Sequence, residues 1–153
     1  MKRGFQLLLF LAVAVLFTGC AAVRELPAEE RKGEPATREF KVSRDLLVSF
    51  LNNDMNGFCK KFSPENQEKM DVKKITETRK EMEKSLGTPV SFSYLTELEF
   101  VTFKIYVWKM KFKRTGKEPN TREEKEFFSE ALVRVITGRT AKDQVVVLGF
   151  NFL

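Results

Sequence analysis

Residues 106–112 read YVWKMKF and are the clearest strand signal in the chain. Large apolar side chains alternate there with valine and lysine, and a period of two is typical of a strand whose faces meet different surroundings. Stretches rich in β-branched and aromatic residues lie around it, so the second half of the chain predicts strands over residues 90–98, 102–114, 125–138 and 144–152. Polar loops at residues 115–124 and 139–143 connect them into an antiparallel meander.

Opposite charges predict how the second and third strands pair. Lys109 is expected to face Glu130 and Lys113 to face Glu126, because opposite charges stabilise cross-strand pairs. Placing Val133 opposite Leu148 then continues the meander into the fourth strand. One face then gathers most of the large apolar side chains, and we expect it to be the core face that the helices cover. Its residues are Tyr106, Trp108, Met110, Phe112, Phe127, Ala131, Val133, Val135, Val146, Leu148, Phe150 and Phe152.

The opposite face of this sheet is apolar at one end. It gathers Phe103, Ile105, Val107, Leu132, Ile136, Val145 and Val147. A solvent-facing sheet seldom exposes so many adjacent apolar side chains without a cover. One interpretation is an interface made by Phe103, Ile105, Val107, Leu132 and Ile136. The other is a register slip at a bulge, or a helix or the N-terminal segment lying across the face.

The residues before the sheet predict helices, so the fold class is α+β. Ser43 is a candidate N-cap for a helix with Leu46, Leu47, Phe50 and Leu51 on one side. Residues 52–54 interrupt the pattern, and Ser63-Pro64-Glu65 predicts a new helix start. Asp71 is expected to cap a further helix that ends at Gly87.

The N-terminus has the layout of a secretory signal peptide. Lys2 and Arg3 precede an apolar run over residues 7–17, and Thr18-Gly19-Cys20 follows. The cysteine after Gly19 resembles the lipobox of bacterial lipoproteins, which implies an acylated Cys20 as the first residue of the mature protein. The alternative is cleavage without a lipid. Ala21 after such a cysteine favours the outer membrane, facing the periplasm, if the organism has one.

The domain boundaries follow from this. Residues 1–19 are expected to be the signal peptide, residues 20–38 the lipidated cysteine and a flexible tether rich in Glu, Arg, Ala and Pro, and residues 39–153 one folded domain.

Composition excludes several classes of function. Without Lys2 and Arg3 the chain has 25 basic and 21 acidic residues, interspersed, which does not suggest nucleic-acid binding. The chain has no histidine, so His-ligated metal sites and His-based catalytic triads are excluded. Cys59 lies among aromatic residues and is expected to be a buried, inert thiol. We expect neither a metal nor a cofactor.

Helices followed by a four-stranded meander resemble the nuclear transport factor 2-like superfamily, and in particular small bacterial lipoproteins of unknown function. The resemblance covers most of residues 40–153 and rests on element order and apolar pattern, most clearly over residues 43–62, 85–89, 106–112 and 147–152. It implies a curved sheet around the helices, a conical pocket and dimerisation through the outer sheet face. The superfamily also contains enzymes that use Asp, Tyr or His in the cone. Here the four aspartates fall at a helix start, a loop, a cap and a turn, namely Asp45, Asp54, Asp71 and Asp143.

These observations favour a membrane-tethered, non-catalytic domain of the cell envelope that acts through protein contact, as a homodimer or an accessory subunit. The alternative is a carrier or sensor for a small apolar ligand, with Tyr106, Trp108, Met110 and Phe112 lining the conical pocket. Plain core packing is the other interpretation of these four side chains.

Overall fold

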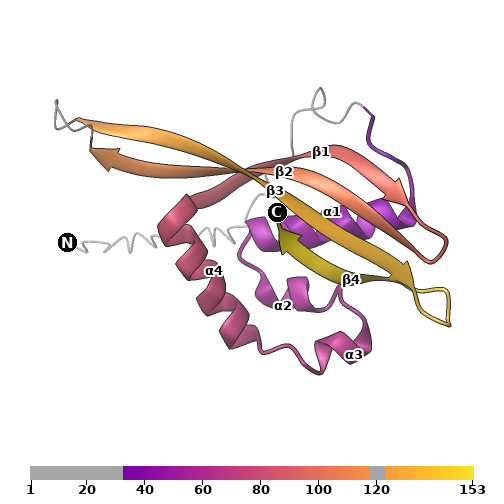
Figure 1. Ribbon diagram of the computed structural model, residues 1–153. Coiled ribbons are helices and arrows are strands. Elements are labelled where there is room, and N and C mark those ends of the chain that lie inside the picture. The colour runs from indigo at the N-terminus through magenta and orange to yellow at the C-terminus, as the bar shows by residue number, and fades with distance from the viewer. Residues whose placement is uncertain (1–32, 118–122) are drawn as a thin grey trace, which may run out of the picture.

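Four helices precede four strands in the computed structural model, which describes residues 33–117 and 123–153 (Figure 1). The helices are α1 (Arg38–Leu51), α2 (Met55–Cys59), α3 (Pro64–Gln67) and α4 (Val72–Leu86). The strands are β1 (Thr88–Glu99), β2 (Phe103–Lys117), β3 (Glu124–Arg139) and β4 (Val145–Phe152), and they form an antiparallel sheet in the order β1-β2-β3-β4. The predicted α+β class, with helices before a four-stranded antiparallel meander, is confirmed.

The start of α1 differs from the sequence-based prediction. Its N-cap is Thr37, whose Oγ1 accepts a hydrogen bond from the Phe40 amide at 3.1 Å. Ser43 lies inside the helix, fully buried, and its Oγ accepts from the Trp108 indole nitrogen at 2.9 Å. The predicted cap at Ser43 is therefore wrong, because this hydroxyl satisfies a buried indole N–H instead of an amide at a helix end.

The predicted helix starts at Pro64 and Asp71 and the predicted helix end at Gly87 are confirmed, whereas Asp54, expected in a loop, is an N-cap that was not predicted. Asp54 accepts from the Gly57 amide at 2.8 Å and begins α2, and Asp71 accepts from the Lys73 amide at 2.8 Å and begins α4. Pro64 is the first residue of α3. Gly87 ends α4 with φ of 100°, and a Cβ there would collide with the Lys113 carbonyl, so only glycine fits this close approach to β2.

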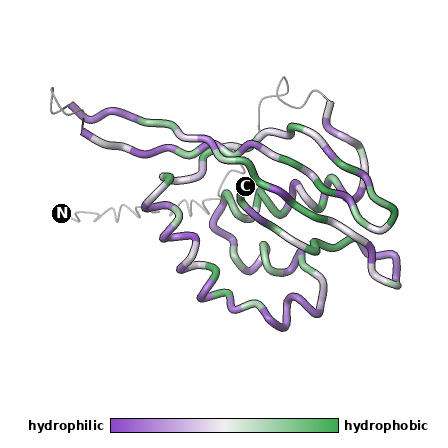
Figure 2. The backbone as a smooth tube through the Cα atoms, viewed as in Figure 1, coloured by the Kyte–Doolittle hydropathy of each residue, from purple (hydrophilic) through white to green (hydrophobic). Residues whose placement is uncertain are grey.

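The core lies between α1 and the face of the sheet that carries the side chains of Tyr106, Trp108, Met110 and Phe112. All four side chains have 0 % exposure. Trp108 stacks on Phe40 of α1 with ring centroids 5.1 Å apart, and Phe92 of β1 meets it edge-on at 5.5 Å. Figure 2 shows that α4 is largely hydrophilic, which agrees with its position at the edge of this core.

The pairing of β2 with β3 differs from the prediction by two residues. Lys109 lies opposite Leu132, and Glu130 lies opposite Lys111. The expected ion pairs nevertheless form diagonally across the strands, Lys109 with Glu130 at 3.4 Å and Lys113 with Glu126. A shift of two residues leaves every side chain on its predicted face, because side chains alternate with a period of two.

The pairing of β3 with β4 corrects the prediction further. Val133 lies opposite Phe152 rather than Leu148, and the register shifts between Ile136 and Thr137. This irregularity reverses the faces of the first half of β4. Val147, predicted on the outer face, is fully buried in the core, whereas Leu148, predicted in the core, is 44 % exposed.

A two-stranded arm extends beyond the rest of the sheet (Figure 1). It consists of residues 114–117 of β2 and residues 124–127 of β3, with Phe128 at its base. The pairing of β1 with β2 stops at Lys113, and the pairing of β4 with β3 begins at Val133, so neither outer strand accompanies the arm. Phe127 and Phe128 are 40 % and 53 % exposed.

The predictions for the signal peptide and Cys20 lie outside the described residues. Within the described residues, no helix combines the length and the apolar character needed to cross a membrane.

Candidate functional site

The first candidate site is an apolar surface on the outer face of the sheet, opposite α1. Its predicted residues lie together on β2 and β3, as the cross-strand pairs of Ile105 with Ile136 and of Lys109 with Leu132 show. Leu132 is 42 % exposed. We call this surface the outer patch, and its residues are Phe103, Ile105, Val107, Leu132 and Ile136, all half-buried apart from the exposed Leu132.

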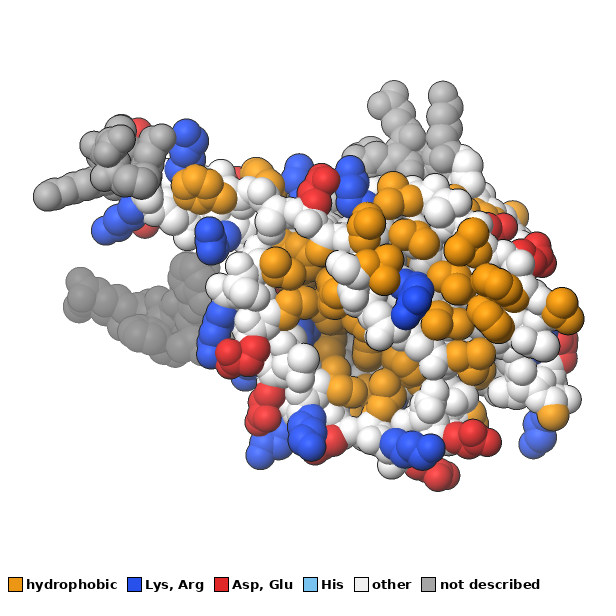
Figure 3. Space-filling view, viewed as in Figure 1, with side chains coloured by type: hydrophobic (Ala, Val, Ile, Leu, Met, Phe, Trp, Pro, Cys, Tyr) orange, Lys and Arg blue, Asp and Glu red, His pale blue; other side chains and the backbone are white. Residues whose placement is uncertain are grey.

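Neighbouring strands extend the outer patch on both sides. Leu98 of β1 lies opposite Ile105 and is 52 % exposed. Leu148 of β4 lies over Gly138, the residue opposite Phe103. Figure 3 shows hydrophobic side chains gathered over this part of the sheet, with most charged side chains around them. Alternation alone predicted that the β2 and β3 residues lie on the outer face. Leu148 lies there only because of the irregularity in the pairing of β4.

Arg134 is the exception within the outer patch. It lies directly opposite Val107 and between Leu132 and Ile136 on the same face of β3. Its Nε is buried and has no hydrogen-bond partner among the described residues. A buried, unpaired guanidinium nitrogen is costly, so the outer patch contains a donor that a covering surface could satisfy. The one hint of this in the sequence is an arginine at a strand position otherwise surrounded by apolar residues.

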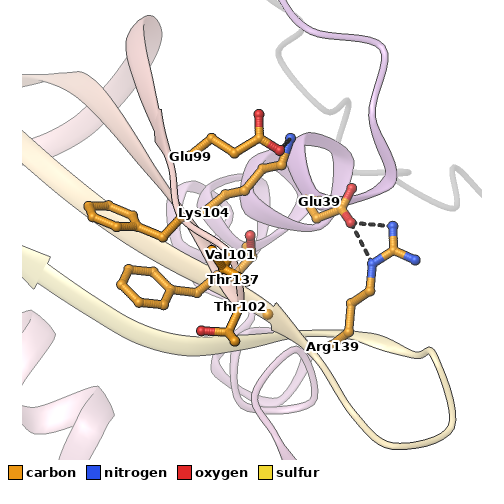
Figure 4. A pocket seen from close by; sticks show the side chains of 10 residues that line it. Glu39, Glu99, Val101, Thr102, Lys104, Thr137 and Arg139 are labelled. Carbon is orange, nitrogen blue, oxygen red and sulfur yellow. Dashed lines mark hydrogen bonds and ion pairs between the residues drawn. The ribbon is translucent and has the colours of Figure 1, made fainter.

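The second candidate is a pocket at the end of the sheet, with a volume of about 470 Å³. It lies where the β1–β2 turn, the end of β3 and the start of α1 meet (Figure 4). We call it the end pocket. Its lining residues are Glu39, Glu99, Phe100, Val101, Thr102, Phe103, Lys104, Thr137, Gly138 and Arg139.

Two ion pairs neutralise the charges of the end pocket. Arg139 donates to Glu39 Oε1 from Nε at 2.8 Å and from Nη2 at 2.5 Å, and Lys104 Nζ lies 3.0 Å from Glu99 Oε1. Burial alone would raise the pKa of Glu39, but a backbone hydrogen bond and the Arg139 guanidinium outweigh it and hold this pKa below its usual value. The Glu99 carboxylate raises the pKa of Lys104.

These directions are the reverse of what acid–base catalysis needs. A general acid needs a carboxyl whose pKa is raised, and a lysine base needs a lowered pKa. The end pocket has an ionised Glu39 and a charged Lys104 instead. Thr137, whose buried Oγ1 has no hydrogen-bond partner among the described residues, leaves one polar group there for other contacts. The arrangement is suited to holding a polar group, not to moving a proton.

The side chains predicted to bind an apolar ligand lie elsewhere. Tyr106, Trp108, Met110 and Phe112 are fully buried among the side chains of α1 and the sheet, and the end pocket is lined by other residues. The Tyr106 hydroxyl reaches the start of α1, where it lies 3.3 Å from Thr37 Oγ1. The four side chains pack in the core, and a ligand-binding role for them stays a prediction.

Cys59 is buried in the core, and burial raises the pKa of its thiol, which disfavours the reactive thiolate. Among the described residues, no group of three or more His, Cys, Asp or Glu side chains could hold a metal ion.

The contact of Glu39 with Arg139, across 100 residues of sequence, was not predicted. The only signal for it was an acid at the expected start of the domain and a base at the expected last turn of the sheet, and neither specifies its partner.

Comparisons with protein families and with curated proteins find no match. Among solved structures, the chain is similar to a ketosteroid isomerase-like protein from Erwinia carotovora atroseptica SCRI1043, with a TM-score of 0.45 and 8 % identity over 73 % of this chain and 89 % of that chain. It is also similar to the intermembrane space region of the chloroplast protein ARC6, with a TM-score of 0.40 and 11 % identity over 78 % of this chain and 98 % of that one. At this level of similarity the role of the chain has to be argued from its own residues.

Proposed function

We propose that this chain is a lipid-anchored domain of the bacterial cell envelope that acts by protein contact through the outer patch and catalyses no reaction. The observation that carries the proposal is the outer patch itself. Exposed and half-buried apolar side chains surround a partly unsatisfied arginine on the face of the sheet opposite α1. Apolar surface with arginine near its centre is typical of protein interfaces.

The chemistry of Arg134 specifies what a partner would supply. Covering the outer patch removes the apolar side chains from water, but it also removes water from the guanidinium. A partner that binds here therefore needs a carboxylate or carbonyl oxygen within reach of Arg134. A second copy or a different envelope protein could provide it.

Membrane attachment is supported by sequence alone. The apolar run before Thr18-Gly19-Cys20 and the small residues at its end favour acylation of Cys20. One acyl group gives weak attachment, whereas two or more hold a protein on a bilayer stably. We place the domain on the periplasmic side of the outer membrane, if the organism has one.

The absence of catalysis is supported by the end pocket. Its carboxylates each meet a cation, and the pKa of Glu39 is lowered. An acid poised for proton transfer at neutral pH would need the opposite shift.

The double substitution Ile105→Lys and Leu132→Lys tests the contact through the outer patch. We expect the parent protein to self-associate in light scattering and the double variant to be monomeric, because two lysines oppose burial of the surface. Circular dichroism should show the same fold for both. Thr115→Lys, at an exposed position of the arm opposite Glu126, is the control and should leave association unchanged.

Two outcomes would contradict this proposal in different ways. If the double variant unfolds, Ile105 and Leu132 are needed for the core and the outer patch is not a free surface. If the parent protein is monomeric, the homodimer is excluded, and crosslinking in membranes would have to identify a separate partner that the double variant loses.

A further inference from the structure

A second apolar surface lies at the turn between β1 and β2. Val101 is fully exposed at 104 %, Phe100 is 48 % exposed, and Leu98 just before the turn is 52 % exposed. Phe100 stacks on Phe103 with ring centroids 4.5 Å apart, so the turn presents its apolar side chains on a rigid support. We call Phe100 and Val101 the apolar turn, and Leu98, which extends the outer patch, borders it. The fully exposed Val101 side chain contributes little to the packing of the fold.

The apolar turn lies at the end of the domain where the chain enters from the Cys20 side. Glu39, in the first turn of α1, lines the same pocket as Phe100 and Val101. Arg38 Nη2 lies 3.1 Å from Asp143 in the adjacent β3–β4 turn. Residues 21–36, which separate Cys20 from this end, can span at most roughly 55 Å of extended chain. The arm projects from the opposite end of the sheet (Figure 1).

We propose that the apolar turn inserts its side chains into the surface of the lipid bilayer, so that the anchored domain stands on the membrane with this end down. This inference rests on the membrane attachment of the proposed function. Phe and Val are side chains that enter the boundary between headgroups and acyl chains. The anchor keeps the turn close to the bilayer, which raises the effective concentration of a contact too weak to act alone.

The charges around the apolar turn favour a hydrophobic rather than an electrostatic contact. Lys104 is paired with Glu99, and Arg139 is paired with Glu39 and Asp143. These two cations are therefore largely neutralised and offer little attraction to anionic lipids. Docking through this end leaves the outer patch facing sideways, open to a partner in the same membrane.

The test uses the full chain, purified with its native acylation and reconstituted in vesicles of phosphatidylethanolamine and phosphatidylglycerol. Val101→Cys carries an environment-sensitive dye. The matched control carries the same dye at Thr115→Cys, an exposed position on the arm, and the parent chain reports any labelling of Cys59. We expect a blue shift and quenching by lipids with spin-labelled acyl chains at position 101 and neither at position 115. The signal should persist in 0.5 M salt, where charge attraction is screened to a few ångströms.

The outcomes separate this proposal from membrane attachment itself. Intact mass shows whether Cys20 is acylated. If it is, and the dye at position 101 stays in water, docking is overturned and attachment stands. If Cys20 is not acylated, the proposed membrane attachment fails. The dye is then measured on the same chain mixed with vesicles, and a lack of quenching there overturns docking as well.

Protein contact at the apolar turn would give a different signature. A blue shift without quenching by the acyl chains, growing with protein density, would mean that a second copy covers the turn and would overturn the proposal. A further variant, Phe100→Ser with Val101→Ser, should abolish protection of the turn from protease on vesicles while leaving the circular dichroism unchanged. Unchanged protection would count against docking.

Discussion

The two faces of β2 are built from alternating residues of one strand, yet they have different surroundings. Trp108 and Met110 on one face are fully buried under α1, whereas Val107 and Lys109 on the other remain half-buried. Both faces contain large apolar residues near the β1–β2 turn. Near this turn, what distinguishes the two faces is therefore the cover. A buried aromatic side chain contributes to folding, while an uncovered one is available for association.

Truncating one side chain on each face tests whether the two faces contribute differently to stability. Trp108→Ala should lower the free energy of unfolding by about 3–5 kcal/mol, because it removes a large buried ring and leaves a cavity. Leu132→Ala on the outer face should cost less than about 1 kcal/mol, as expected for a partly exposed side chain. Denaturation by urea measures both. Equal losses would mean that the outer face is covered as well.

A smaller effect tests the polar contact that joins α1 to the core face. Ser43→Ala removes the acceptor of the Trp108 indole N–H and should lower the free energy of unfolding by about 1–2 kcal/mol. Ser93→Ala, on the outer face opposite Lys109, is the matched control and should be close to neutral. A neutral Ser43→Ala would mean that the indole finds another partner.

The prediction from sequence succeeded where periodicity carried the information. The strands and the faces of β2 and β3 follow from alternation, and the helix cap at Asp71 follows from local hydrogen-bond chemistry. The charge pattern identified the right ion pairs but not the register, because long lysine side chains reach diagonally as easily as straight across.

Long-range features were beyond the sequence. The irregularity that buries Val147 and exposes Leu148 changes no residue type, so neither pattern nor propensity signals it. Ser43 had the residue type of a cap, but its partner, Trp108, lies 65 residues away. The arm also escaped prediction, because the strand pattern does not tell where the neighbouring strands stop.

The smallest expected effect concerns the pH dependence of the Glu39–Arg139 ion pair at the end of the sheet. The folded pKa of Glu39 lies below its unfolded value, so its contact with Arg139 stabilises the fold above the unfolded pKa, and this is lost as pH falls through the folded pKa. Glu39→Gln should lower the free energy of unfolding at pH 7 by less than about 1 kcal/mol, since Arg139 is exposed. In strong acid the variant and the parent should be equally stable in urea titrations. A difference that persists in acid would point to packing instead of charge.

The uninterrupted pairing of β2 with β3 has a mechanical consequence. The two strands stay in register from Phe103 opposite Gly138 to Lys117 opposite Glu124, so the same 15-residue strand that begins at the apolar turn also forms one side of the arm. At about 3.3 Å per residue it spans roughly 50 Å. Because the hydrogen bonds of an antiparallel pair run perpendicular to the strands, a force that slides β2 along β3 loads many of them together in shear. The hairpin is thus a stiff strut, able to transmit a pull on the arm to the opposite end of the domain.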